Sequence, residues 1–228
     1  MIFCFIDSLN DICEMIAVIT GDIVASRKLV NQDKWLSPLK NLFALWGERA
    51  KDWEISRGDF FQLEIANPEE ALYKAFIIKA LVKKTKPIDK HKKISIVDTR
   101  MAIGIGKKTY SGETISENNG SAYINAGEKF DLLKKQALSI GVKSPWKEFD
   151  NEVNLYFKLA GTFMDKYSIS SAEIVEIVLK GPNATQEEIG KLLGIKQNSV
   201  SGRWNRAHID ELLEIEKIFR KKIKYLLQ

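Results

Sequence analysis

The sequence predicts an α+β protein, in which a ferredoxin-like sandwich precedes a small all-α domain. Two observations support this fold class. Between residues 15 and 145 the apolar residues follow strand-like and helix-like patterns in the order strand, helix, hairpin, helix, strand, helix, which is the order of a ferredoxin-like sandwich. From residue 146 onward the apolar spacing is helical throughout. We therefore expect an N-terminal extension at 1–14, the sandwich at 15–145 and a helical domain at 146–228.

The composition is that of a soluble globular chain. Its 228 residues are 45% hydrophobic and 29% charged, with a net charge of +5. No apolar run approaches the ~20 residues needed to cross a bilayer, and the two cysteines, Cys4 and Cys13, form no metal-ligand pattern. We expect a cytoplasmic protein. The extension at 1–14 has acids but no basic region, which argues against a secretion signal. Met15 directly precedes the first strand, so the extension is interpreted as an over-long translation start or a short extra strand.

The first strand is expected at residues 16–20, an uninterrupted apolar run typical of a strand that is buried on both faces. It is predicted to stop at Gly21, directly before Asp22. A carboxylate at the end of a central strand is held by the backbone, and ligand crevices form at such ends. Asp22 is therefore a candidate site residue. In the alternative interpretation, Gly21 and Asp22 only form a turn.

The next elements follow from the apolar spacing. A helical stripe runs from Trp35 to Trp46, and two alternating runs at 53–65 flank a tight polar turn, as in a β-hairpin. A helix is predicted at 69–84. A lysine-rich loop at 83–93 is expected to be a solvated connection, with His91 exposed in it. A strand at 94–106, a helix at 121–137 and a short strand at 139–142 complete the first domain.

Asp59 lies in the predicted hairpin turn. In a ferredoxin-like sheet the end of the first strand and this turn lie on neighbouring strands, so Asp22 and Asp59 should face each other. Two nearby carboxylates repel unless a cation lies between them, which favours a Mg²⁺ site that binds a nucleoside triphosphate. The alternative is that both aspartates serve turns.

The most specific signal is a helix-turn-helix at 185–208. Thr185 and Glu188 form a capping box for a helix through Leu193, with Ile189, Leu192 and Leu193 predicted to face inward. Gly194 follows in the turn, and a second helix is expected at 197–208. Two further helices are predicted before this motif, at 154–166 and 170–179. The C-terminal stretch at 209–227 either closes the domain or forms a homodimer.

The second helix of the motif has one inward and one outward face. At 100° per residue, Val200, Trp204 and Ala207 face inward. The predicted DNA-contacting residues are Asn198, Ser199, Ser201, Gly202, Arg203, Asn205 and Arg206. Amides and arginine suit adenine and guanine edges, whereas Arg203, nearer the core, is expected to meet a phosphate.

Four short motifs resemble a known catalytic domain. GDIVAS at 21–26, RGDFFQLE at 57–64, RMAIGIG at 100–106 and NGSAYINAGEKF at 119–130 occur in the order found in the palm-like domain of class III nucleotidyl cyclases and GGDEF proteins. From Met15 onward the chain resembles the SatD family, in which such a domain precedes a helix-turn-helix. The resemblance implies that Asp22 and Asp59 bind the metal and that Ile23 offers its main-chain carbonyl.

The catalytic set departs from the cyclase pattern. Ile55 stands where cyclases have a base-reading residue, and the candidate transition-state residues are Asn125 and Lys129 in place of Asn and Arg. Lysine keeps the charge but loses the bidentate fork. Arg57 and Gly58 replace the two glycines of GGDEF. We therefore expect a DNA-binding transcriptional regulator that senses a nucleotide with Mg²⁺; the alternative is a nucleotidyl cyclase or polymerase-like enzyme controlled by the helical domain.

Overall fold

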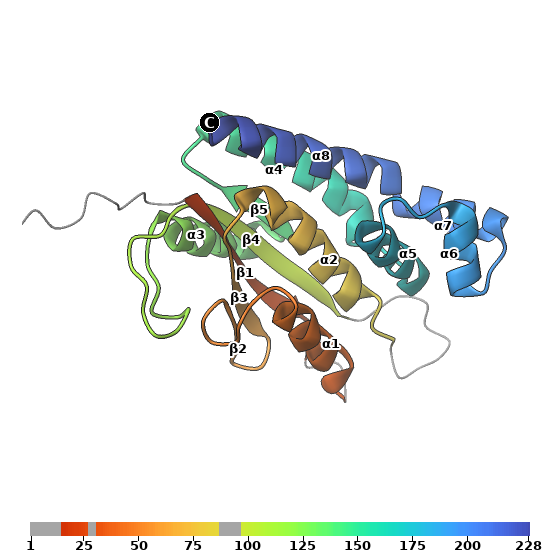
Figure 1. The fold of residues 1–228 in the computed structure, drawn as a ribbon, viewed down its shortest axis with the longest axis horizontal. Coiled ribbons are helices and arrows are strands. Elements are labelled where there is room, and N and C mark those ends of the chain that lie inside the picture. The colour runs from red at the N-terminus through yellow and green to blue at the C-terminus, as the bar shows by residue number, and fades with distance from the viewer. Residues whose placement is uncertain (1–14, 27–30, 87–96) are drawn as a thin grey trace, which may run out of the picture.

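The computed structural model describes residues 15–26, 31–86 and 97–228. It shows an α+β chain, with a five-strand mixed sheet and interleaved helices followed by a C-terminal helical region (Figure 1). The predicted extension at 1–14, most of the lysine-rich loop with His91, and the expected first residues of the strand at 94–106 lie outside the described residues.

The sheet has the strand order β2-β3-β1-β4-β5. β1 pairs antiparallel with both β3 and β4, β2 and β3 form the predicted hairpin, and β5 adds to β4 in parallel. The bounds are β1 Met15–Val24, β2 Trp53–Ser56, β3 Phe60–Ile65, β4 Asp98–Lys107 and β5 Ile140–Lys143. The predicted order of strands and helices is thus confirmed, and β1 is the central strand.

The expected stop of the first strand at Gly21 is wrong. β1 continues to Val24, and Asp22 pairs with Phe60 on one side and Arg100 on the other. A Cβ at Gly21 would overlap the ring of Phe61 on the neighbouring strand. This glycine therefore permits close packing inside the sheet and does not end the strand, so Asp22 projects from the strand itself.

Helices cover both faces of the sheet. On one face, α1 (Asp33–Ala44) and α2 (Ala71–Lys83) pack on Ala17, Ile19 and Ile23 of β1. A short 3-10 helix, η2 (Pro68–Glu70), precedes α2. On the other face, α3 (Ser121–Gln136) covers β4, β1 and β5 and packs on Ile16 and Val18. Because β1 alternates in this way, Asp22 lies on the α3 face of the sheet.

The C-terminal region shares one continuous core with the α2 face of the sheet. α5 packs against α2, α4 against β5 and α8 against η2, and Figure 1 shows α4 and α8 side by side above the sheet. The bounds are α4 Lys147–Met164, α5 Ile169–Lys180, α6 Gln186–Leu193, α7 Gln197–Ala207 and α8 Ile209–Leu226.

The first of these helices begins earlier than predicted, at Lys147 instead of Asn154. The Asp150 carboxylate accepts hydrogen bonds from the Ser144 main chain and side chain, which fixes the entry into the helix. None of the helices in the described parts of the chain combines the length and the apolar character that a membrane span requires.

Candidate functional site

The structure brings the three predicted metal residues together at one end of β1. Asp22 pairs with Phe60, the residue after Asp59, and the Ile23 main-chain N–H donates to the Asp59 carbonyl at 3.0 Å. In an antiparallel strand the N–H and the C=O of one residue point to the same side. The Ile23 carbonyl is therefore directed toward the hairpin turn that carries Asp59.

The hairpin turn is tight and holds Asp59 close to β1. Three residues, 57–59, connect the paired Ser56 and Phe60. Two of them, Arg57 and Gly58, have positive φ, at 52° and 86°, a conformation typical of tight hairpin turns. The Ser26 hydroxyl donates to Asp59 Oδ2 at 2.8 Å. The segment that follows β1 therefore fixes one oxygen of this carboxylate.

The Asp22 carboxylate is only partly compensated. Its Oδ2 lies 3.5 Å from Arg100 Nη1, while its Oδ1 is buried and has no hydrogen-bond partner among the described residues. Burial raises the pKa of Asp22 above its ordinary value. Arg100 and Lys134 lower this pKa and Asp59 raises it, so the Asp59 charge is felt at Asp22.

The charges of two cations that the sequence analysis missed act on this carboxylate. Arg100 lies opposite Asp22 on β4. Lys134, on α3, places its ammonium group 4.2 Å from the centre of the Phe130 ring, which in turn contacts Phe60 at 5.8 Å between ring centres. From the sequence, strand alternation predicts that Arg100 and Met101 lie on opposite faces of the sheet. The pairing of Arg100 with Asp22 becomes known only from the register between β1 and β4.

The donor set suits a hard cation. Two carboxylates and a main-chain carbonyl are ligands that Mg²⁺ accepts, with water and phosphate oxygens in the remaining positions. The buried, unpartnered Asp22 Oδ1 is a group that a cation would satisfy. Within the described ranges no cluster of three or more His, Cys, Asp or Glu residues could hold a metal, so water or ligand oxygens would have to complete the coordination.

The two catalytic candidates make contacts elsewhere. The Asn125 side-chain amide donates to the Ile105 carbonyl of β4 at 2.9 Å. The Met101 N–H donates to the Ser139 carbonyl, on the side of β4 that faces β5. Main-chain groups an even number of residues apart point to the same side of a strand, so the Ile105 carbonyl also points to that side. It lies beyond the last β4–β5 pair, at Gly104. Asn125 thus satisfies a carbonyl that the short strand β5 leaves open.

Lys129 lies over β5. A Cβ at Gly141 would overlap its Cε. Burial lowers the pKa of Lys129, while the Asp150 charge raises it. Its side chain therefore faces the start of α4, and the cation of α3 whose charge acts on Asp22 is Lys134.

The second candidate site is the α6–α7 pair. The predicted capping box is present: the Thr185 hydroxyl accepts from the Glu188 N–H at 3.2 Å, and the Glu188 carboxylate accepts from the Thr185 N–H at 2.8 Å. Gly194 ends α6 with φ 64°. A Cβ at Gly190 would lie 2.9 Å from the Ile195 carbonyl oxygen, so this glycine permits the close approach of the turn.

The prediction that Leu192 faces inward is wrong. Its side chain is 71% exposed, whereas Ile189 is buried. The buried side of α6 is centred between Ile189 and Gly190, and Leu192 lies more than a quarter turn away from it. The eight residues of α6 contact α7 only along that side, which leaves Leu192 at the surface.

The inward face of α7 is largely as predicted. Val200 and Ala207 are buried. Trp204 is only partly buried: it packs against the core at its edge, and its indole N–H donates to Asp210 Oδ1 at 3.0 Å. The indole thus joins α7 to α8.

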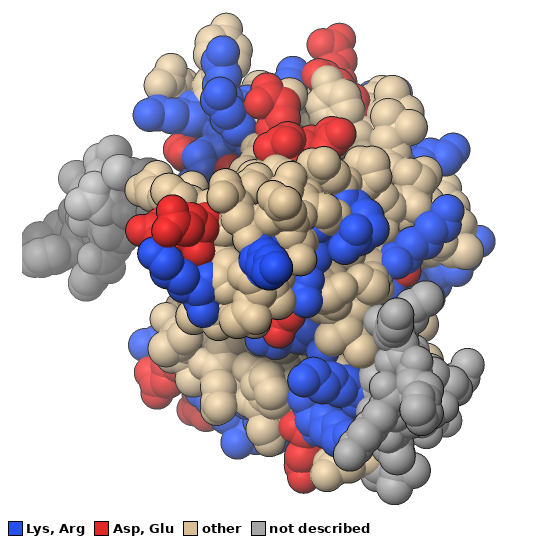
Figure 2. All heavy atoms as spheres, turned by 90° about the vertical axis from the view of Figure 1, so that its right-hand side faces the viewer, with Lys and Arg blue, Asp and Glu red and all other residues tan. Residues whose placement is uncertain are grey.

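The predicted DNA-contacting residues form the outer side of α7. Asn198, Ser199, Asn205 and Arg206 are exposed, and Ser201, Gly202 and Arg203 are intermediate. Arg203 Nη1 lies 3.0 Å from Glu173 Oε2 of α5, so this arginine is held in an ion pair. Figure 2 views the molecule from the side of α6 and α7 and shows basic side chains interspersed with acidic ones.

Comparisons with known proteins add no family assignment. No protein-family model matches the chain, and no curated protein matches it significantly. The function is therefore argued from the geometry of the two candidate sites.

Proposed function

We propose that the chain is a cytoplasmic, DNA-binding transcriptional regulator of the SatD type, whose palm-like N-terminal domain senses a nucleotide together with Mg²⁺. The antiparallel strand order β2-β3-β1-β4 supports this assignment, because it is the order of a ferredoxin-like sandwich. β5 is an addition in parallel to β4. The α6–α7 pair, with its capping box and tight glycine turn, supports a helix-turn-helix.

One observation carries the DNA-binding proposal: the outer side of α7 is open and polar. Asn198, Asn205 and Arg206 are exposed, and no acidic residue occurs in the α7 sequence. Such amide and guanidinium groups read adenine and guanine edges in the major groove. Arg203 is paired with Glu173, so we expect the exposed Asn198, Asn205 and Arg206 to contact the bases.

The nucleotide proposal rests on the incomplete pairing of Asp22. Asp22, Asp59 and the Ile23 carbonyl would hold Mg²⁺, and the ion would bring positive charge to the phosphate groups of the ligand. Arg100 and Lys134 supply two more cations beside Asp22. Mg²⁺, Arg100 and Lys134 would together attract the negatively charged phosphate groups of a nucleoside triphosphate.

Sensing is favoured over catalysis by the positions of the catalytic candidates. Asn125 is bonded to the β4 backbone, and Lys129 lies over β5 next to Asp150. Among the described residues, neither side chain is hydrogen-bonded or ion-paired to Asp22 or Asp59. Groups that stabilise a transition state must point at the reacting atoms, and these two are engaged in holding the fold.

A buried ion network offers a route from the nucleotide site to α7. Asp98 lies two residues before Arg100 on β4 and binds Lys79 and Lys83 of α2, at 2.8 and 3.2 Å. α2 packs on α5, and α5 packs on α7, which it also holds through the Glu173–Arg203 ion pair. A shift of β4 on ligand binding would thereby reach the DNA-binding helix.

DNA binding is tested by selecting duplexes from a randomised pool with the wild-type protein and measuring anisotropy at fixed salt. Arg206→Ala should weaken binding to the selected duplex about ten- to a hundredfold. Arg49→Ala, which removes an exposed cation between α1 and β2, should change it little. Failure to select any duplex, or equal effects of the two substitutions, would overturn the proposal.

A further inference from the structure

α4 and α8 form an antiparallel pair on the outside of the molecule. The Phe149 and Phe219 rings lie 5.7 Å apart, and Glu152 Oε2 accepts from Lys222 Nζ at 2.7 Å near the start of α4. At the other end the Phe163 ring stacks on His208 at 4.6 Å. Figure 1 shows the two helices side by side along their length.

The outer side of this pair is unusually apolar. Leu155 and Leu159 of α4 are 55% and 58% exposed, and Tyr225 of α8 is 77% exposed. Leu155 and Leu159 follow Glu152 by one and two turns along the side of α4 that borders α8. Such contiguous exposed apolar side chains mark an interaction surface.

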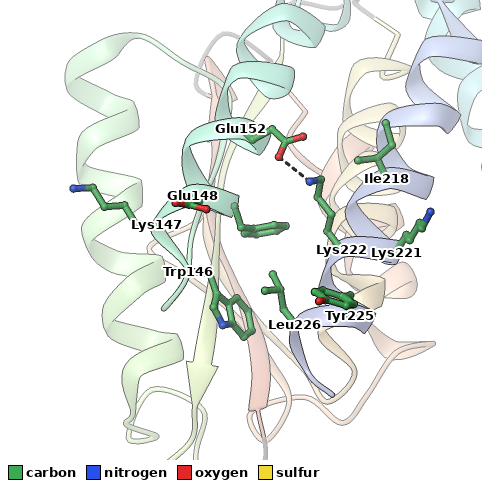
Figure 3. A pocket seen from close by; sticks show the side chains of 10 residues that line it. Trp146, Lys147, Glu148, Glu152, Ile218, Lys221, Lys222, Tyr225 and Leu226 are labelled. Atoms are coloured by element: carbon green, nitrogen blue, oxygen red, sulfur yellow. Dashed lines mark hydrogen bonds and ion pairs between the residues drawn. The ribbon is translucent and has the colours of Figure 1, made fainter.

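A groove of about 740 Å³ lies at the end of the same face, where α4 begins and α8 ends. Figure 3 shows Trp146 of the α4 entry and Leu226 and Tyr225 of α8 around it, with Lys221 and Lys222 at its border. Glu148 and Glu152 also line the groove, and Glu152 is paired with Lys222. The groove therefore combines an apolar lining with lysines and glutamates.

The outward side of α8 separates its charges along the helix. Its exposed acidic residues, Asp210, Glu211 and Glu214, lie in the first half of the helix. Its exposed lysines are Lys217, at the midpoint, and Lys221 and Lys224 in the second half. A second α8 in antiparallel orientation would bring each acidic half against a basic half. A parallel orientation would set lysines against lysines, which is repulsive.

We propose that this face binds a second copy of the chain, with α8 antiparallel to its counterpart across a two-fold axis. An axis between Lys217 and Ile218 sets Glu214 opposite Lys221 of the other copy, and these two residues lie on the same side of α8, seven positions apart. The acidic half of one α8 then lies against the half of the other α8 that carries Lys221 and Lys224. Because the contact is isologous, each pairing occurs twice.

The available area suits such a dimer. α4 and α8 each have 18 residues and are about 27 Å long at 1.5 Å per residue, and two adjacent helices are together about 20 Å wide. The flat footprint of the face is therefore on the order of 540 Å² per copy, and the accessible surface of its side chains is larger. Stable interfaces bury about 800 Å² per partner.

The mass in solution tests the proposal without DNA or nucleotide, so its outcome does not depend on the proposed function. Sedimentation equilibrium should give about twice the chain mass of 25.9 kDa. Leu155→Glu should raise the dimer dissociation constant at least about a hundredfold, because a charge would be buried in the interface. Leu45→Glu is the matched control, since Leu45 is 80% exposed at the end of α1, and it should leave the mass unchanged.

Charge reversal tests the orientation. Glu214→Lys and Lys221→Glu should each weaken the dimer about tenfold, because each places two like-charged contacts in the interface. The double variant should restore wild-type association. A wild-type monomer at about 100 μM, binding only of an added acidic peptide, or a double variant weaker than both single variants would overturn the proposal. Circular dichroism of each variant confirms that it is folded.

Discussion

Asp22 on β1 and Arg100 on β4 lie opposite each other, with Asp22 Oδ2 3.5 Å from Arg100 Nη1. This distance is at the limit of a hydrogen bond, and the other oxygen of Asp22 is buried and has no partner among the described residues. The pair therefore compensates only part of the cost of burying the carboxylate. Binding sites often retain such destabilising groups, because a ligand satisfies them.

The first prediction concerns the stability of the metal-free protein. Since burial raises the pKa of Asp22, the protonated carboxyl is favoured in the folded state. Protonation of Asp22 therefore contributes to the stability of the folded state. This contribution is complete below the pKa of aspartate in the unfolded chain, near 3.8, and is lost as the pH rises through the higher pKa of Asp22 in the folded protein. Asp22→Asn should therefore raise the midpoint of thermal unfolding at neutral pH in the presence of a chelator, and this gain should vanish in acid.

The pH series is its own control, because an unrelated gain from the amide would persist at low pH. Asp33→Asn provides a matched substitution at an exposed aspartate in the first turn of α1, where we expect no such pH-dependent gain. A lower unfolding midpoint for Asp22→Asn at neutral pH would mean that Arg100 compensates the carboxylate fully.

The second prediction concerns ligand binding. A nucleoside triphosphate with Mg²⁺, at a hundred times its dissociation constant, should stabilise the protein by about 2.7 kcal/mol. For a chain of this size, that is a shift of about 5–10 °C in the unfolding midpoint. Asp59→Ala should abolish the shift, since Asp59 lies beside Asp22 and Ile23.

The same preparations separate sensing from catalysis. Labelled triphosphates should be recovered unchanged from the wild-type protein. Turnover that Asp59→Ala removes would favour the cyclase-like or polymerase-like alternative. If no nucleotide shifts the unfolding midpoint with or without Mg²⁺, the nucleotide proposal fails and the sheet domain is a scaffold.

Local patterns in the sequence were sufficient to predict the order of elements and the placement of Asp22 and Asp59 on neighbouring strands; that their carboxylates face each other stays a prediction. Strand alternation, the hairpin turn and the capping box of Thr185 and Glu188 depend on residues close in the chain, and all are present. The placement of the two aspartates followed from the strand order alone. Features set by neighbouring residues, or by the order of the strands, can therefore be predicted from the sequence.

Features that depend on contacts between distant segments were not predictable. Gly21 lies inside β1 because the Phe61 ring of the neighbouring strand leaves no room for a Cβ there. Arg100 is identified as the partner of Asp22 only by the β1–β4 register. Leu192 is exposed because α6 contacts α7 on one side only. In each case a tertiary contact decides the outcome, and local periodicity carries no information about it.

The third prediction concerns the buried ion network between the sheet and the helical region. Lys79 and Lys83 are 1% and 3% exposed, and both bind Asp98. Asp98→Ala leaves each buried ammonium group with fewer partners, so unfolding in urea should show a loss of about 3 kcal/mol. Glu70→Ala is the control, because the Glu70–Lys74 pair is partly exposed and spaced i, i+4. Its loss should cost no more than about 0.5 kcal/mol.

Lys79 also binds Asp165 at the end of α4, at 2.7 Å, so the network joins the two parts of the chain. If it transmits the nucleotide signal, Asp98→Ala should also reduce the effect of nucleotide on DNA binding. A variant that loses stability but keeps the full nucleotide effect would restrict the network to a structural role.

The last prediction compares a glycine at the contact between β4 and α3 with a glycine of α3 that lies outside this contact. Gly104 of β4 lies under α3, where an added Cβ would overlap the Ala122 carbonyl oxygen and the Ala126 nitrogen. Gly104→Ala should therefore displace α3 and lower the free energy of unfolding by about 3 kcal/mol. It should also weaken nucleotide binding, because α3 carries Lys134, whose charge acts on Asp22.

Gly127 of α3 is the matched control, since a Cβ there meets no atom within 4 Å. Gly127→Ala should raise the free energy of unfolding by about 0.5–1 kcal/mol, because alanine restricts the unfolded chain and favours the helix. Urea unfolding of both variants measures the difference. Equal effects would mean that α3 does not rest on the β4 backbone at Gly104, and the position of Lys134 beside Asp22 would then lose its structural basis.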